Sequence, residues 1–272
     1  DCLLSRGLGD VYKRQGTETA PTTPGDSVLN EFKNYDDLLA AKRITGSNIS
    51  FVIPRRNWTT GTAYDIYRHD YEEYVTGSSS TKVTANSTAT TLFDATFYVL
   101  TSDRNVYKCL DNAGNANSTV EPTGTATSVI TTGDGYKWKY IYTLSASEQS
   151  NFLSTDFMAV ATNSTVASAA VDGAVNIVKI KTAGSGGTNG THASVPIRGD
   201  GSSGVCSVTV SGGAVTAVTV TTPGTGYTFA YIRNADIVSA GATSLSGAEL
   251  DVIIEPKGGH GKNAIEELGG FF

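Results

Sequence analysis

"YKWKYIYTL", residues 136–144, is the stretch that decides the fold. Aromatic or leucine side chains occupy every second position, and lysine, isoleucine and threonine fill the positions between them. A period of two is typical of a β-strand, because successive side chains point to opposite faces of a sheet. The stretch therefore predicts an antiparallel strand with an aromatic inner face. That face consists of Tyr136, Trp138, Tyr140, Tyr142 and Leu144.

Short structural signals lie on both sides of this strand. "FYVLT" (97–101) and "VYKCL" (106–110) are separated by four polar residues, a pattern that predicts a β-hairpin. After the strand, Ser145 and Glu148 have the spacing of a capping box, which predicts a short helix ending near Leu153.

The segment upstream, residues 24–44, carries apolar side chains at helical spacing. Asp26 or Ser27 can cap a helix there, because their side chains accept hydrogen bonds from free backbone N–H groups. Residues 49–53 then read as a short core strand that Pro54 ends. The predicted helix stripe consists of Val28, Phe32, Tyr35 and Leu39.

From about residue 174 the chain is poor in charge and rich in Gly, Val and Thr. "IVKIKTAGSGG" (177–187) and "VTAVTVTTPGTGY" (215–227) echo each other, each an alternating strand followed by a G-x-G turn. Two copies are too few for a solenoid, so we predict a small β-sandwich-like domain. "AELDVIIEP" (248–256) predicts a return strand, and "GGHGKNAIEELGG" (258–270) a glycine loop with a short helix.

The N-terminal peptide "DCLLSRGLGDVYKRQ" differs in character from the chain that follows. It resembles translated sequencing-adapter peptides, and the single methionine is Met158, so we expect residues 1–15 to be foreign and both ends to be truncated. The expected class is mainly β with a few short helices, in antiparallel β-sandwich domains with a Gly-rich β insert. The expected division is 1–15 artefact, 16–173 helix plus β-sandwich core, 174–240 insert, and 241–272 return strand and short helix.

Charge and composition exclude several classes of function. The net charge of −6, or −7 without residues 1–15, argues against general affinity for nucleic acid. We find neither a run of ~20 apolar residues nor the apolar core of a signal peptide. Three widely spaced cysteines suggest synthesis in a reducing cytoplasm.

The sequence contains no convincing catalytic or cofactor motif. His69, His192 and His260 have no metal-ligand spacing, and the "GGHGK" run departs from a phosphate loop at both ends. "DNAGNANS" (111–118) lacks the order of a calcium loop and reads as an Asn/Gly turn. We therefore predict a protein that is not an enzyme and that has no metal, no cofactor and no small-molecule substrate.

Two acidic pairs, Glu72-Glu73 and Glu266-Glu267, could still supply an acid and a base for a carbohydrate-cleaving enzyme. Adjacent acids on an exposed stretch are more often solvated, and we expect solvated carboxylates at both pairs.

Three segments, in their order and spacing, resemble one known family. They are "GDSVLNEFKNYDDLLAAKRI…FVIPRRNW", "VYKCLDNAGNANSTVEPTG" and "GDGYKWKYIYTLS", within residues 21–145. They are similar to the baseplate wedge subunit of T-even-type contractile-tailed bacteriophages, the gene product eight family. The resemblance implies an elongated β-sandwich virion protein without catalytic residues. It also implies a homodimer, assembled in the bacterial cytoplasm, that contacts other wedge proteins.

Arg55, Arg56 and Trp58 of the I-P-R-R-x-W motif are the candidate interface residues. Arg and Trp are both enriched in binding hot spots. The alternative is an internal role, in which the arginines pair with carboxylates such as those of Asp65 or Asp70. For the whole chain, the competing hypothesis is a tail fibre or spike domain that binds host glycans through exposed tyrosines. No role at a membrane or with nucleic acid is expected.

Overall fold

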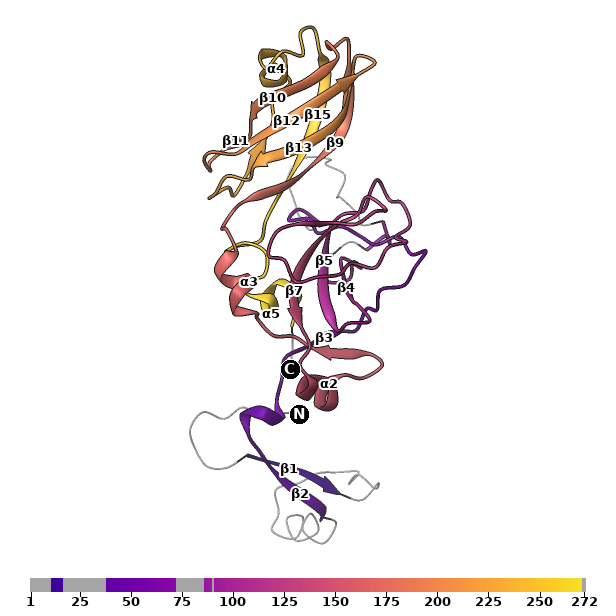
Figure 1. Cartoon of the computed structure of the whole chain (residues 1–272). Helices are drawn as coiled ribbons and strands as arrows, with labels where there is room; N and C mark the ends of the chain where they lie inside the picture. The colour runs from indigo at the N-terminus through magenta and orange to yellow at the C-terminus, as the bar shows by residue number, and fades with distance from the viewer. Residues whose placement is uncertain (1–10, 17–37, 72–85, 90, 271–272) are drawn as a thin grey trace.

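The computed structural model describes residues 11–16, 38–71, 86–89 and 91–270 of the 272. Strands account for 38% and helices for 12% of the residues, which confirms the predicted mainly-β class with a few short helices. The molecule is elongated (Figure 1). One β domain lies at one end, a second core with an antiparallel sheet lies in the middle, and a two-stranded pair lies at the other end.

The middle core is built on a four-stranded antiparallel sheet in the order β4-β5-β7-β6. The predicted hairpin is confirmed, because Leu100 pairs with Val106 across a turn in which Arg104 has a φ of +64°. The predicted central strand is confirmed as β7, which pairs with β5. The strands are β4 (Tyr98–Leu100), β5 (Asn105–Asp111), β6 (Ile130–Thr131) and β7 (Lys137–Thr143).

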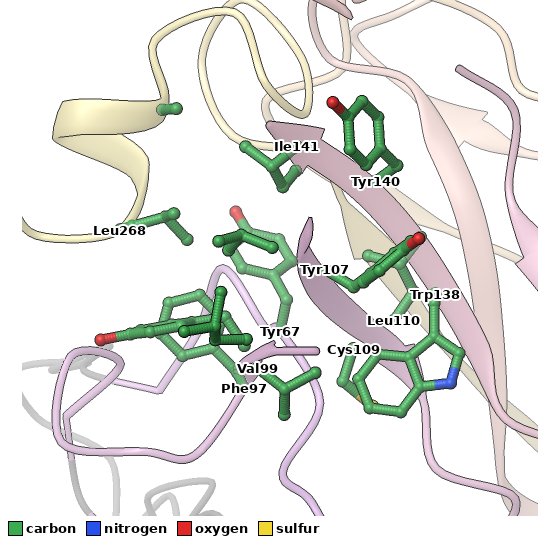
Figure 2. Close-up of a cluster of buried hydrophobic side chains, with 14 of the residues drawn as sticks. Tyr67, Phe97, Val99, Tyr107, Cys109, Leu110, Trp138, Tyr140, Ile141 and Leu268 are labelled. Atoms are coloured by element: carbon green, nitrogen blue, oxygen red, sulfur yellow. The ribbon is translucent and has the colours of Figure 1, made fainter. Parts of the chain in front are cut away.

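Strand β7 is buried on both faces, so the expectation of a single aromatic inner face was incomplete. Trp138 and Tyr142 are buried on the aromatic face, yet Ile141 is fully buried and Lys139 is 6% exposed on the other. Leu268, beside the C-terminal helix, and strands from the second domain belong to the same core cluster and cover that other face. Figure 2 shows Leu268 and Ile141 beside the aromatic side chains of the hairpin.

Short elements close the middle core. Helix α2 (Ala146–Phe152) begins with the predicted capping box: Ser145 N donates to Glu148 Oε2 (2.7 Å), and Glu148 N donates to Ser145 Oγ (3.3 Å). Strand β3 (Val52–Pro54) pairs with β8 (Phe157–Ala159). Of the expected core run, only Ile53 is fully buried. The remaining short helices are η1 (Gly46–Asn48), α3 (Ser164–Ala169) and α5 (Ala264–Glu267).

The second domain has its own aliphatic core between a three-stranded sheet, β10-β12-β13, and a two-stranded sheet, β15-β9. Ile254 of β15 pairs with Val175 of β9, so hydrogen bonds cross the border expected at residue 240. The elements are β9 (Val175–Ser185), β10 (Gly190–Pro196), β11 (Arg198–Gly199), β12 (Val205–Ser211), β13 (Ala214–Thr222), β14 (Ala230–Tyr231), α4 (Asn234–Ser239) and β15 (Ser246–Ile254).

The sequence echo in this domain is also a conformational echo. The aligned glycines Gly184 and Gly224 have φ of +68° and +69°, and Gly186 and Gly226 have φ of +76° and +75°. Residues other than glycine seldom adopt this left-handed region. Each copy is therefore a strand with two glycines in the left-handed conformation at or just beyond its end.

The helix predicted over residues 24–44 is wrong where the structure describes it. Leu38–Ile44 forms strand β2, which pairs with β1 (Val11–Gly16), and Leu39 is 67% exposed. Backbone pairing with a neighbouring strand outweighs the helical spacing of a few apolar side chains. The first three members of the predicted stripe lie outside the described residues. Residues 11–15 of the expected adapter segment lie in strand β1.

Within the described part of the chain, no helix combines the length and the apolar character needed to cross a lipid bilayer.

Candidate functional site

The guanidinium of Arg55 forms hydrogen bonds within its own chain. Its Nε donates to Asn57 Oδ1 (2.9 Å), and its Nη1 donates to the carbonyl of Ser154 (2.7 Å), at the end of the β3–β8 pair. The side chain thus ties the I-P-R-R-x-W motif, which begins in β3, to the segment before β8.

Arg56 binds the end of a neighbouring loop. Its guanidinium donates to the carbonyl oxygens of Phe93 (2.9 Å), Asp94 (3.3 Å) and Ala95, and it lies 4.9 Å from the ring centroid of Tyr98. A planar guanidinium is suited to this combination of several acceptors and an aromatic face. Arg56 therefore holds residues 93–95, the segment that leads into β4.

The carboxylates proposed as partners of these arginines bind other donors. Asp65 accepts from the backbone and hydroxyl groups of Ser87 and Thr96. Burial alone would raise the pKa of Asp65, but these hydrogen bonds outweigh it and lower the pKa. Asp70 forms a bidentate pair with Arg68 (2.7 Å). The alternative of an internal role therefore does not operate through Asp65 or Asp70; the internal partners of Arg55 and Arg56 are Asn57 Oδ1 and backbone carbonyls.

Trp58 begins a chain of hydrogen bonds that joins all three segments of the family resemblance. Its indole Nε1 donates to Ser118 Oγ (3.1 Å), which donates to Asp134 Oδ2 (3.1 Å). Asp134 also accepts from the backbone N–H groups of Thr119 and Val120. Although burial opposes it, these bonds and one from the Thr132 hydroxyl lower the pKa of Asp134 to about 2. Asp134 is thus a fixed anion that organises the loop.

A buried ionic cluster lies on the face of β5 and β7 that is away from Trp138. Lys108 is fully buried, and its Nζ contacts Glu267 Oε1 (2.5 Å) and His260 Nδ1 (2.9 Å). The same ammonium lies 3.6 Å from the ring centroid of Tyr67. Two polar partners and an aromatic face therefore surround the charge of Lys108.

The pKa values in this cluster follow from burial and from the ion pair. Burial would raise the pKa of Glu267, but Lys108 and His260 outweigh it and bring that pKa to about 2. Burial and the nearby Lys108 lower the pKa of His260, so its imidazole stays neutral at pH 7. Burial also lowers the pKa of Lys108, and Glu267 opposes this shift.

A second buried lysine stands directly opposite the first. Lys139 of β7 is the cross-strand partner of Lys108, and like charges in this position repel. Two carboxylates, Glu255 and Glu267, lie on the segments that cover this face. The two lysines and the two glutamates together have no net charge, which lowers the cost of burying them.

The glycine loop at residues 258–261 does bind anions, but they belong to the chain itself. His260 N donates to Glu255 Oε2 (2.9 Å), and Gly261 N donates to Glu267 Oε2 (2.6 Å). Backbone N–H groups in glycine turns are suited to this task. The expectation that Glu267 is solvated was wrong, while Glu266 is exposed as expected and Glu72-Glu73 lies outside the described residues.

Sequence reasoning missed the burial of Lys108 and Lys139 and the role of Glu267. The available signal was a lysine inside each of two otherwise apolar strands. A buried lysine requires a carboxylate partner, but the partner lies 159 residues away and periodicity does not identify it.

The three histidines do not meet. His260 is in the ionic cluster, His192 contacts the carbonyl of Thr188 (2.9 Å), and His69 accepts from the N–H of Ile254 (3.3 Å). Among the described residues, no group of three or more His, Cys, Asp or Glu side chains is arranged to hold a metal ion. In the 111–118 segment, Asn112 Nδ2 donates to Tyr64 O and to Asn115 Oδ1. The second of these bonds closes the predicted turn.

Two surface pockets flank the ionic cluster. One, of about 200 Å³, is lined by Tyr67, Phe93 and Glu267 and is mainly apolar. The other, of about 190 Å³, is lined by Lys139 and Glu255 at the junction of the two domains. We refer to the second as the junction pocket.

Comparison of the chain with protein-family models, with curated proteins and with solved structures gave no match.

Proposed function

We propose that this chain is a structural subunit of a bacteriophage tail baseplate wedge, which holds neighbouring wedge proteins through protein–protein contacts. The observation that carries the proposal is the hydrogen-bond chain Trp58–Ser118–Asp134. Its three members come from the three segments on which the family resemblance rests. Motif residues that brace one another are what a framework protein requires.

The charges at the domain junction support a role in holding fixed geometry. Arg68 of the middle core pairs with Asp251 of β15 (2.6 Å), and Lys179 of β9 pairs with Asp111 of β5 (2.7 Å). Both pairs are partly buried, where ionic contacts are stronger than at a free surface. They bind the second domain to the middle core at two points, a suitable arrangement for a rigid connector.

The glycan-binding alternative has one observation in its favour. Phe229 and Tyr231 expose 56% and 46% of their surface, two residues apart on the second domain. The tyrosines Tyr136, Tyr140 and Tyr142, by contrast, are buried in the middle core. Exposed aromatic rings are also typical of protein interfaces, so this surface suits the proposed role as well.

The oligomeric state provides the first test. Light scattering on the 28.4 kDa chain at micromolar concentration should give a dimer, and native mass spectrometry of mixtures with purified wedge proteins should give a stoichiometric complex. A monomer that binds none of these proteins but binds to a glycan array would contradict the proposal and favour the alternative.

Arg56→Ala and Arg55→Ala separate the two roles of the motif. Because Arg56 holds three backbone carbonyls, Arg56→Ala should lower the free energy of unfolding by about 1–3 kcal/mol. Loss of wedge binding in an Arg55→Ala chain with unchanged stability would instead place Arg55 in the interface. Urea unfolding and the binding assay on both variants give the answer.

A further inference from the structure

The junction pocket combines two buried charges of opposite sign with an apolar wall. Lys139 is 6% and Glu255 is 7% exposed, and both line the pocket. The wall is formed by Val129, Val171 and Pro223. Pockets at domain junctions, apolar with a few convergent polar groups, are the usual form of small-molecule sites.

The two lysines of the cross-strand pair differ in how the protein satisfies them. Lys108 has a carboxylate, an imidazole and an aromatic ring around its ammonium. Lys139 Nζ donates one hydrogen bond, to Thr127 O (2.5 Å), and in the described part of the chain it forms no ion pair. An ammonium has three donors, so Lys139 retains two for acceptors in the pocket.

Glu255 also retains binding capacity. Its Oε1 accepts from Asn176 Nδ2 and its Oε2 accepts from His260 N. Each carboxylate oxygen can accept a further hydrogen bond, so a donor in the pocket has an acceptor to meet. The pocket therefore presents spare donors at one residue and spare acceptors at another.

We propose that the junction pocket binds a small zwitterion of the α-amino-acid class. The ligand carboxylate accepts from Lys139, the ligand ammonium donates to Glu255, and a short aliphatic side chain lies against Val129, Val171 and Pro223. A simple anion would add an uncompensated charge beside Glu255, whereas a zwitterion leaves the buried charges balanced.

The pocket is small, with a volume of about 190 Å³, and alanine and valine are among the smallest members of the ligand class. The inference is independent of the proposed structural role, because it rests on the pocket alone.

Isothermal titration of the full chain with L-valine tests the proposal. We expect saturable binding, and about tenfold or greater loss of affinity for both N-acetyl-L-valine and L-valinamide, which each lack one of the two charges. Absence of saturable heat up to about 10 mM L-valine would overturn the proposal. Equal binding of either derivative would overturn the assignment of the charge that it lacks, and with it the zwitterion.

Variants locate the binding. Lys139→Met and Glu255→Gln should each weaken L-valine binding about tenfold or more, while Lys181→Met, an exposed lysine on β9, should leave it unchanged. If the buried-charge variants do not fold, Ala169→Phe remains informative, because Ala169 is exposed and lines the pocket. Unchanged affinity in a folded Ala169→Phe chain would overturn the site.

Discussion

The middle core and the second domain reach the same mainly-β class by different chemistry. The middle core packs aromatic rings such as Trp138 and Phe97 and buries an ionic cluster around Lys108. The second domain packs mainly Val, Ile and Ala and relies on glycine turns such as Gly224. The ion pair of Lys108 and Glu267 in the first is buried on both sides, while in the second the buried carboxylate of Asp236 pairs with the exposed arginines Arg198 and Arg233. Changes to charge should therefore damage the first, and changes to backbone conformation the second.

Glu267→Gln should have the largest effect. Removing one partner of a buried pair leaves Lys108 uncompensated, which costs about 3–5 kcal/mol. Urea unfolding followed by tryptophan fluorescence reports on the middle core, because both tryptophans, Trp58 and Trp138, belong to it. A loss below about 1 kcal/mol would show that the pair contributes no more than a surface contact.

Acid should destabilise the middle core before the second domain. The pKa of Glu267 is about 2 in the folded chain against a reference of 4.5, so its contribution is complete above about pH 5. That contribution, of about 3 kcal/mol, is lost as the pH falls from 4.5 to about 2. The lowered pKa of His260 acts in the same direction, because below pH 6.5 protonation favours the unfolded chain.

Hydrogen exchange at a series of pH values measures this difference between the domains. Amides of β5 and β7 should lose protection in acid while those of β12 and β13 keep it. Glu267→Gln should reduce the dependence between pH 4.5 and pH 2, to which the lowered pKa values of Asp65 and Asp134 also contribute, and an unchanged profile in that variant would contradict the assignment to Glu267.

Gly224→Ala should damage the second domain selectively. A methyl group at Gly224 would lie 2.6 Å from Ser202 O in addition to the cost of a φ of +69°, so we expect a loss of about 2–3 kcal/mol. Gly226→Ala is the matched control, because its φ is +75° but nothing lies within 4 Å of the added carbon. It should cost about 1–2 kcal/mol. Equal losses would show that backbone conformation alone, and not the close approach, sets the requirement.

Lys181→Met should have the smallest effect. Lys181 pairs with Glu249 across β9 and β15 (3.3 Å), but both side chains are more than half exposed. Such pairs contribute about 0–1 kcal/mol. Differential scanning calorimetry should therefore show a thermal midpoint close to that of the parent chain, and a large fall would mean that the second domain also depends on its charges.

Local features of the fold could be predicted from the sequence. The alternation in residues 136–144, the hairpin around Arg104 and the capping box of Ser145 and Glu148 each depend on residues close together in the chain. For such features, pattern and turn chemistry carry the information. The glycine echo belongs to the same group.

Features that depend on distant segments were predicted poorly. Leu38–Ile44 became a strand because a partner strand lies beside it, and the second face of β7 is buried because the C-terminal segment returns to cover it. The partners of Arg56 are backbone carbonyls, and because every residue has one, the sequence does not indicate which of them Arg56 binds. For the same reason the site at Lys108, Lys139 and Glu255 was not predicted.

The pairing of Val175 with Ile254 has a consequence for how this chain can be edited. The second domain leaves and re-enters the middle core at adjacent positions, where Glu255 N donates to Ala174 O (2.9 Å). Residues 175–254 thus form a cassette whose two ends are neighbours. Its ends suit insertion into a loop of another scaffold, whereas excising it would uncover the face of the middle core that Ile177 and Ile253 cover.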